Sequence, residues 1–295
     1  MLEFRPLQWQ DKEIFTRYYS DSPVHYAEYS FFCLWAWRHA YPIEIAFSKQ
    51  NLLWFRSGGV IPGMFGPLGN WRDNNINWDN ELSQFERGSV IYDVPADLKN
   101  LLDSRENLRF LNDRDQHEYI YSSKDLISLK GKAFAHKRNR VRAFLDGYEW
   151  DYFPIKREDF DSIMEFQEKW RIHRDATLNQ DEADSLLDED EAIKEALNHW
   201  DEFNFIGGLI KIEDKIIAYT IAQELDEQNL DVCFEKAFAE YAGSYQAINY
   251  LFLKNLPKTY LYINREEDMG EPGLREAKLS YNPVLMLEKY QLEIL

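Results

Sequence analysis

Short segments in which apolar and polar residues alternate occur in both halves of the chain, and stretches with helical periodicity lie between them. In the second half, three apolar segments follow one another closely and predict consecutive strands at 205–212, 215–224 and 229–237. The turn Glu213-Asp214 between the first two is typical of a hairpin. Helices are expected at 133–145, 157–174, 181–202, 243–255 and 273–279. Single strands are expected at 150–155, 260–263 and 284–290.

The first half shows a similar order of elements. A strand at 2–5 and a helix at 11–20 precede a predicted hairpin of 43–47 with 52–55. Later segments predict helices at 77–86 and 95–103 and strands at 90–94, 107–111 and 118–121. We therefore predict an α/β (α+β) protein with two related domains, 1–123 and 124–295, each a mixed, largely antiparallel sheet flanked by helices. This order of elements is similar to that of the acetyltransferase-like (GNAT) fold.

Composition narrows the class of protein. Apolar residues make up 45% of the chain, enough for a sizeable core, and 34 basic against 52 acidic residues give a net charge of −18. Such a charge repels duplex DNA and anionic lipid at long range. The chain shows no signal peptide, no membrane-spanning run and no metal-ligand spacing, so we expect a cytoplasmic protein without a bound metal. Cys33 and Cys233 lie in apolar surroundings and are expected to be reduced, buried thiols.

A basic segment at 129–142 stands out against this acidic background. It contains six Lys or Arg residues and no acidic residue. Lys137, Arg138 and Arg142 are candidates for binding the phosphates of a donor, because Arg138 and Arg142 lie four residues apart on one helical face. The alternative is a solvated helix whose charge is offset by the acidic segment 181–202.

A strand followed by a glycine and a helix provides a second candidate site. Helix N-termini attract phosphate, which makes Gly243, Ser244, Tyr245 and Gln246 candidates for cofactor binding. Glu235 precedes them on a strand face opposite to Val232 and Phe234, and it is a candidate general base or anchor for a substrate amine. The alternative is an ion pair on a sheet surface. The segment 242–247 does not reproduce the Gln/Arg-x-x-Gly-x-Gly/Ala loop of acetyl-CoA enzymes.

A third constellation follows the predicted strand 260–263, at the end where open α/β sheets build their sites. Arg275 and Lys278 lie three residues apart on one face of a short helix and suit a carboxylate, a phosphate or a developing oxyanion. The alternative is helix capping and salt bridges such as Asp268 with Arg275. The candidates for substrate binding in this region are Asn264, Arg265, Glu266, Asp268 and Tyr281.

Several of these segments together resemble one known family. The chain is similar to the family named for the C-terminal domain of phosphatidylglycerol lysyltransferase, in a standalone form. The segments that carry the resemblance are 29–31, 34–37, 125–126, 129–132, 137–139, 234–237, 243–249, 264–270, 273–275, 277–278 and 281–283. The resemblance implies a tandem GNAT-like fold and kinship with enzymes that move an aminoacyl group from aminoacyl-tRNA to a lipid or peptidoglycan acceptor. The segment 277–282 also resembles a motif of Fem-type transferases, which implies that Lys278 stabilises charge on the ester carbonyl.

These observations favour an acyl or aminoacyl transferase. We expect a donor of acyl-CoA or aminoacyl-tRNA, an amine or hydroxyl acceptor, no tightly bound cofactor, and contact with the acceptor end of tRNA. Glu235, Arg275 and Lys278 are the expected catalytic residues. The alternative is a non-catalytic GNAT-like protein that binds a phosphate-bearing ligand or a partner. A weaker alternative is nucleic-acid binding through the basic segment, whose affinity would fall steeply with salt.

Overall fold

The chain forms two compact units, each built from more than one stretch of sequence. The computed structural model describes residues 2–58, 63–175 and 180–295. The first unit contains residues 1–118, 267–272 and 286–295, and the second contains residues 119–266 and 273–285. The sequence places one boundary after residue 123, whereas the chain first passes between the units at Glu118–Tyr119 and then returns to the first unit twice.

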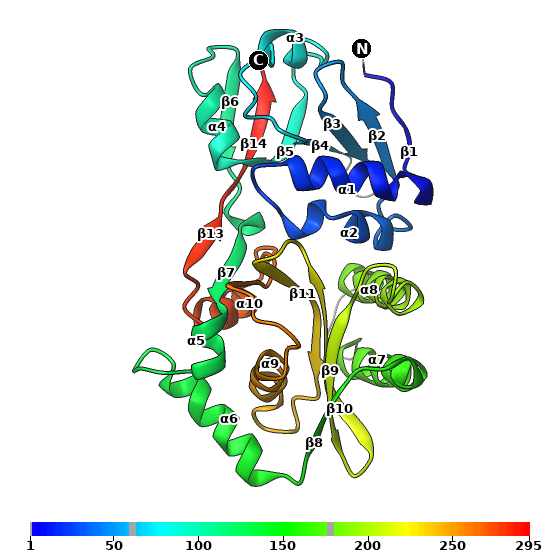
Figure 1. Ribbon diagram of the computed structural model, residues 1–295, viewed down its shortest axis with the longest axis vertical. Helices are drawn as coiled ribbons and strands as arrows, with labels where there is room; N and C mark the ends of the chain where they lie inside the picture. Colours follow the sequence, from blue (N-terminus) through cyan, green and yellow to red (C-terminus); the bar gives the residue numbers. More distant parts are fainter. Residues whose placement is uncertain (1, 59–62, 176–179) are drawn as a thin grey trace. The chain divides into compact units, whose positions relative to one another are not determined.

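The first unit contains a seven-stranded sheet of order β1-β2-β3-β4-β5-β14-β6 (Figure 1). Its strands are β1 (Arg5–Pro6), β2 (Ile43–Phe47), β3 (Leu53–Ser57), β4 (Gly63–Leu68), β5 (Val90–Pro95), β6 (Leu108–Asn112) and β14 (Lys289–Ile294). Its helices are η1 (Trp9–Asp11), α1 (Lys12–Asp21), η2 (Ala27–Tyr29), α2 (Phe31–Ala36), α3 (Trp78–Leu82), α4 (Ala96–Leu102) and η3 (Arg114–Gln116).

Local sequence signals explain much of this sheet. The predicted hairpin is confirmed, since β2 and β3 pair antiparallel from Ile43 opposite Ser57 to Phe47 opposite Leu53. α2 begins after Ser30, whose side chain accepts a hydrogen bond from the Cys33 backbone N–H, as an N-cap serine does. The expected helix at 77–86 is shorter, and Asn77 caps it.

The second unit contains another seven-stranded sheet, of order β13-β7-β12-β11-β10-β9-β8. Its strands are β7 (Glu118–Ser122), β8 (Asp151–Pro154), β9 (Ile206–Ile212), β10 (Lys215–Glu224), β11 (Asn229–Ala237), β12 (Tyr262–Asn264) and β13 (Leu285–Leu287). Its helices are α5 (Ser123–Ser128), α6 (Ala135–Gly147), η4 (Arg157–Asp159), α7 (Phe160–Asp175), α8 (Gln180–Asn198), α9 (Ser244–Lys254) and α10 (Pro272–Leu279). In Figure 1, α9 lies on one face of this sheet, whereas α7 and α8 lie on the other.

The three consecutive strands of the second half are confirmed. β9, β10 and β11 pair antiparallel in chain order. α6 docks through Phe144 and Val141, which are buried as its periodicity predicts. Phe144 packs in one apolar cluster with Ala247 and Ile248 of α9, so these two helices are held together against the sheet.

Each sheet contains a parallel pair of strands within a largely antiparallel pattern. In the first unit, β4 and β5 pair over Met64–Ile91 and Phe65–Tyr92. In the second, β11 and β12 pair from Asn229–Tyr262 to Asp231–Asn264 and then separate. The prediction of two similar α/β (α+β) units is confirmed by these matching sheets.

The end of the chain departs from the sequence prediction. The expected strand 284–290 is two strands, β13 and β14, on either side of Glu288. β14 pairs with β5 and β6, so the last strand belongs to the first sheet rather than to the second. The sequence did not predict that β13 and β14 belong to different sheets, because sheet membership depends on non-local pairing, which hydrophobic periodicity does not encode.

Candidate active site

The candidate site lies in the second unit, where β11 and β12 separate. Beyond the last paired residues, the Glu235 side chain of β11 meets Arg265, which directly follows β12. Arg265 Nη2 lies 2.7 Å from Glu235 Oε1, and the two side chains are only 14% and 9% exposed. Because a buried ion pair excludes water from both partners, their mutual position is well determined.

Asn249 of α9 fixes the other oxygen of Glu235. Its Nδ2 donates a hydrogen bond of 3.0 Å to Glu235 Oε2. Val232 and Phe234 are buried. The pairing of β10 with β11 shifts register between Phe234 and Asp231, so the strict alternation predicted for this part of β11 is interrupted. Glu235 thus forms an ion pair within the fold, which agrees with the alternative interpretation given above. It lies beyond the point where the parallel strands β11 and β12 separate.

Two cations lie against the ring of Tyr281. Lys137 of α6 is buried, and its Nζ lies 3.8 Å from the centroid of this ring. The guanidinium carbon of Arg265 lies 4.8 Å from the same centroid. Burial and, to a smaller extent, the positive charge of Arg265 lower the pKa of Lys137 to about 8, against the opposing effect of Glu235. Burial lowers the pKa of Arg265, but Glu235 together with Tyr281 and Tyr121 outweighs burial and raises this pKa above its usual value.

Tyrosines complete the surroundings of these charges. Tyr121 of β7 contacts Tyr281 edge to face, with ring centroids 6.3 Å apart. The Tyr121 hydroxyl donates a 2.8 Å hydrogen bond to the Lys278 carbonyl, which ties β7 to the end of α10. Burial raises the pKa of both phenols above the ordinary tyrosine value, so both are neutral hydrogen-bonding groups at neutral pH. Among the residues around Glu235, Tyr121 and Asn249 were not predicted as site residues from the sequence.

The start of α9 uses its polar groups inside the fold. The Ser244 hydroxyl donates to the Phe238 carbonyl at 2.8 Å, and the Ala242 N–H donates to the Tyr148 hydroxyl at 3.0 Å. The Tyr245 hydroxyl accepts a hydrogen bond from Trp170 Nε1 at 3.2 Å. Gly243 has a φ of +89°, and a Cβ there would lie 2.4 Å from the Arg140 carbonyl oxygen of α6. Gly243 is therefore required for the close approach of α6 to the start of α9. This structural role explains the glycine without a bound phosphate.

The other predicted donor-binding residues are dispersed. Arg138 donates hydrogen bonds to the carbonyls of Leu129 and Gly131, so its guanidinium closes the loop before α6. Arg142 is exposed on α6, and Gln246 is half-buried on α9. Phosphate binding by Arg138 and Arg142 stays a prediction.

The predicted catalytic cations of α10 are not among the hydrogen-bond partners of Glu235 in the described part of the chain. Lys278 and Arg275 are half-buried, and Lys278 Nζ lies 5.8 Å from the Tyr119 ring centroid. The recorded partners of Glu235 are Asn249 and Arg265. Arg265, predicted as a substrate-binding residue, is thus the cation that the fold brings to Glu235.

The remaining predicted substrate-binding residues belong to different units: Asn264 and Glu266 lie in the second unit and Asp268 lies in the first. The Asn264 side chain accepts a hydrogen bond of 2.8 Å from the Glu266 N–H and shapes the turn after β12. Asp268 belongs to the first unit, where it is fully buried. It lies 3.3 Å from Arg114 and accepts a hydrogen bond from the Gly270 N–H.

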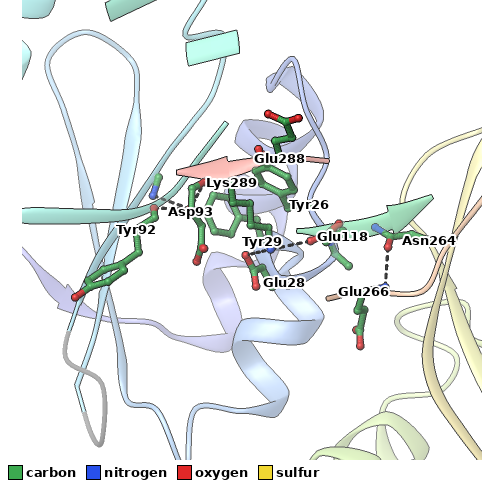
Figure 2. A network of polar contacts seen from close by, with 12 residues as sticks. Tyr26, Glu28, Tyr29, Tyr92, Asp93, Glu118, Asn264, Glu266, Glu288 and Lys289 are labelled. Carbon is green, nitrogen blue, oxygen red and sulfur yellow. Dashed lines mark hydrogen bonds and ion pairs between the residues drawn. The ribbon is translucent and has the colours of Figure 1, made fainter. Parts of the chain in front are cut away.

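The first unit contains a buried ionic network that the sequence analysis missed. Lys289 is fully buried, and its Nζ contacts Glu28 and lies 3.2 Å from Glu118 Oε1. Figure 2 shows Glu28, Asp93 and Glu118 around Lys289. Burial raises the pKa of Asp93 to about 6 and the pKa of Glu28 well above its usual value. Its members are so far apart in sequence that no local motif identifies them.

Three carboxylates in and beside this network lie close enough together to be considered as ligands of a metal ion. Within the described residues, Glu28, Glu118 and Glu267 each offer a carboxylate oxygen, and these oxygens lie within 4.8 Å of one another. The Lys289 ammonium already contacts two of these carboxylates. We therefore interpret the cluster as an ion network centred on lysine.

Among the helices of the described residues, none is both long enough and apolar enough to cross a membrane.

Solved structures of other proteins share this architecture. A conserved protein of unknown function from Bacteroides thetaiotaomicron is 29% identical, with each chain covered over 100% of its length and a TM-score of 0.85. L-PGS from Bacillus licheniformis is 13% identical and has a TM-score of 0.62, with 98% of this chain and 92% of that chain covered. A tandem GNAT protein from the clavulanic acid biosynthesis pathway is 8% identical and has a TM-score of 0.51, with 100% and 99% covered. The predicted tandem GNAT-like fold is thereby confirmed.

Sequence comparison gives the family. An uncharacterised protein of Mycoplasmoides gallisepticum is 25% identical over 184 residues, which cover 60% of this chain and 56% of that protein. This chain therefore matches little more than half the length of that relative. Residues 22–293 match the family described as phosphatidylglycerol lysyltransferase, C-terminal. The chain belongs to the phosphatidylglycerol lysyltransferase C-terminal family.

Proposed function

We propose that this protein is an aminoacyl transferase whose reaction takes place beside Glu235 in the second unit. The observation that carries the proposal is the position of this carboxylate, held by Asn249 and Arg265 where β11 and β12 separate. A carboxylate fixed in this way can hold the ammonium group of an acceptor or donor and accept its proton. The family and the tandem GNAT-like fold support transfer of an acyl group.

The donor that fits best is aminoacyl-tRNA rather than acyl-CoA. At the start of α9, the Ala242 N–H and the Ser244 hydroxyl are already engaged within the fold. Donors that are already hydrogen-bonded within the fold are not available to bind the pyrophosphate of coenzyme A, which would lie at a helix N-terminus. The exposed cations of the basic segment, among them Lys132 and Arg142, remain for a larger polyanion such as the tRNA acceptor end. A cytoplasmic location accords with such a donor and stays a prediction.

A donor panel tests the class of reaction. The full chain is mixed with aminoacyl-tRNA, uncharged tRNA, acyl-CoAs or free CoA, and its thermal unfolding is followed. A ligand present at 100 times its dissociation constant stabilises the folded state by about 2.7 kcal/mol. We expect stabilisation by aminoacyl-tRNA. Stabilisation by acyl-CoA alone would instead indicate ordinary N-acyl transfer, and stabilisation by no member of the panel would favour the non-catalytic alternative.

Replacing Glu235 with Gln is expected to lower the rate of transfer at least about 100-fold, because the variant loses a proton acceptor and a negative charge. The readout is the release of labelled amino acid from aminoacyl-tRNA to an acceptor fraction, with folding checked by circular dichroism. Glu240→Gln is the matched control, since Glu240 is exposed in the loop before α9. Equal rates for the wild type and the folded Glu235→Gln variant would exclude the assignment.

Replacing Lys278 with Ala tests the role that the family resemblance assigns to this residue. Removing one donor to a developing oxyanion costs about 100-fold to 1,000-fold in rate. Lys278 is half-buried on α10, so we expect a folded variant with a loss in this range. Lys254→Ala, at the exposed end of α9, is the control. A rate within about twofold of wild type would leave Arg265 as the better candidate for this role.

A further inference from the structure

The site around Glu235 has more buried positive charge than negative charge. Glu235 is the single carboxylate in this group, and both of its oxygens are engaged, one by Arg265 and one by Asn249. Lys137 is a second buried cation. In the part of the chain that the structure describes, no carboxylate pairs with Lys137 Nζ, which packs on the Tyr281 ring. This excess is notable in a protein of net charge −18.

Arg265 also has an unused donor. Its Nη1 is buried and has no hydrogen-bond partner among the described residues, although Nη2 is bound to Glu235. Buried N–H groups are satisfied in the great majority of cases, because leaving one without a partner is costly. A guanidinium with one nitrogen paired and the other unpaired is therefore prepared to receive an acceptor oxygen from a ligand.

The two cations share one aromatic surface. Lys137 Nζ lies 3.8 Å and the Arg265 guanidinium carbon 4.8 Å from the Tyr281 ring centroid. They come from different elements, α6 and the turn after β12, so the fold brings together two like charges that repel each other. An anion between them would relieve that repulsion.

We infer that Arg265 and Lys137 form a subsite for one carboxylate or phosphate group of the substrate, beside Glu235. The inference rests on the proposed function in one respect, that the ligand of this subsite is a substrate of the transfer. Glu235 next to this subsite suits an ammonium group, so the fitting substrate has an amine and an oxyanion a few bonds apart. Amino acids and amine-bearing phosphate esters belong to this class.

Lys137 makes the subsite sensitive to pH. The charged groups that face it are Arg265 and Glu235, and the phenol of Tyr281 packs against it. Its pKa is lowered to about 8 by burial and by Arg265. Lys137 is therefore fully charged well below pH 8 and loses its charge as the pH rises through 8. For an anion that does not itself titrate in this range, affinity is expected to fall about tenfold between pH 7 and pH 9.

The test measures anion binding to the full chain without any donor. The probes are acetate, glycine, inorganic phosphate and phosphoethanolamine, and binding is followed by calorimetry and saturation-transfer NMR. Glycine binding more tightly than acetate would identify a carboxylate with a neighbouring amine. Phosphoethanolamine binding more tightly than glycine would identify a phosphate ester. Acetate gives the pH profile, because it stays ionised from pH 7 to pH 9.

Two variants of Lys137 keep the test decisive. Lys137→Met is expected to weaken acetate binding at pH 7 about tenfold, to the level of the wild type at pH 9. Lys137→Arg keeps its charge at pH 9, so its affinity for acetate should no longer fall between pH 7 and pH 9. Lys132→Met, an exposed cation of the same basic segment, is the control and should bind like wild type.

Three results would overturn the subsite. They are the absence of binding for all four probes, an equal effect of Lys132→Met and Lys137→Met, and an unchanged pH profile in Lys137→Arg. Because binding is measured without transfer, loss of activity in Glu235→Gln with intact anion binding would separate the two proposals.

Discussion

Replacing Lys289 with Met is expected to lower the free energy of unfolding of the first unit by about 3–5 kcal/mol near pH 8. The reason is that Lys289 is fully buried and contacts the carboxylates of Glu28 and Glu118. Methionine has a similar shape but no charge. Removing one partner of a buried ion pair leaves the other charge buried and uncompensated, which is the costly change.

The pH dependence of this loss has a definite sign. Burial raises the pKa of Asp93 to about 6 and the pKa of Glu28 well above its usual value. A carboxyl group whose folded pKa is raised stabilises the fold below its unfolded pKa, and that stabilisation is lost as the pH rises through the folded value. The deficit of Lys289→Met should therefore be smaller at pH 5, where more carboxyl groups are protonated, than at pH 8.

Urea unfolding followed by hydrogen exchange of first-unit peptides would measure the Lys289 effect. Lys99→Met is the matched control, because Lys99 forms an i,i+4 pair with Asp103 in the same unit and such pairs contribute less than about 1 kcal/mol. The double variant Lys289→Met/Glu118→Gln should recover part of the loss. A deficit no larger than that of Lys99→Met would contradict the assignment of Lys289 as the centre of the network.

Replacing Gly243 with Ala is expected to lower the free energy of unfolding of the second unit by about 2–5 kcal/mol. An alanine at a φ of +89° costs about 1–2 kcal/mol in backbone strain. Its Cβ would also lie 2.4 Å from the Arg140 carbonyl oxygen, so α6 and α9 must move apart, at a further cost of about 1–3 kcal/mol. The measurement is chemical unfolding with exchange of second-unit peptides.

Gly273→Ala is the control for this strain. Nothing lies within 4 Å of its added Cβ, and the residue is in the first turn of α10. Glycine to alanine at such a helical position is expected to be neutral or to stabilise by up to about 1 kcal/mol. If Gly243→Ala were as well tolerated as Gly273→Ala, the close approach of α6 to α9 would not require glycine.

Local and short-range features were predictable from the sequence. The hairpin of β2 with β3 and the series β9, β10 and β11 follow from apolar runs with turn residues between them. The strict alternation expected from Val232 to Glu235 was not predictable in this way, because the register of β10 with β11 shifts there. The family resemblance was carried by short motifs, and the match over residues 22–293 confirms it.

Long-range partners were not predictable in the same way. Arg265 was predicted to bind substrate and Glu235 to be catalytic, but the ion pair between them depends on how β12 separates from β11. Lys137 was assigned to donor phosphates because of its basic neighbours, whereas the rotation of α6 turns it inward to Tyr281. Periodicity places a residue on a helix face but does not say which distant side chain that face meets.

The position of β14 has a consequence for the order in which the protein folds during synthesis. β14 pairs with β5 on one side and β6 on the other, although it contains residues 289–294. A ribosome therefore releases both neighbours of this strand long before the strand itself has left the exit tunnel. Because β5 and β6 must wait for residues 289–294, the sheet whose translation begins first is completed only after all strands of the second sheet have been translated.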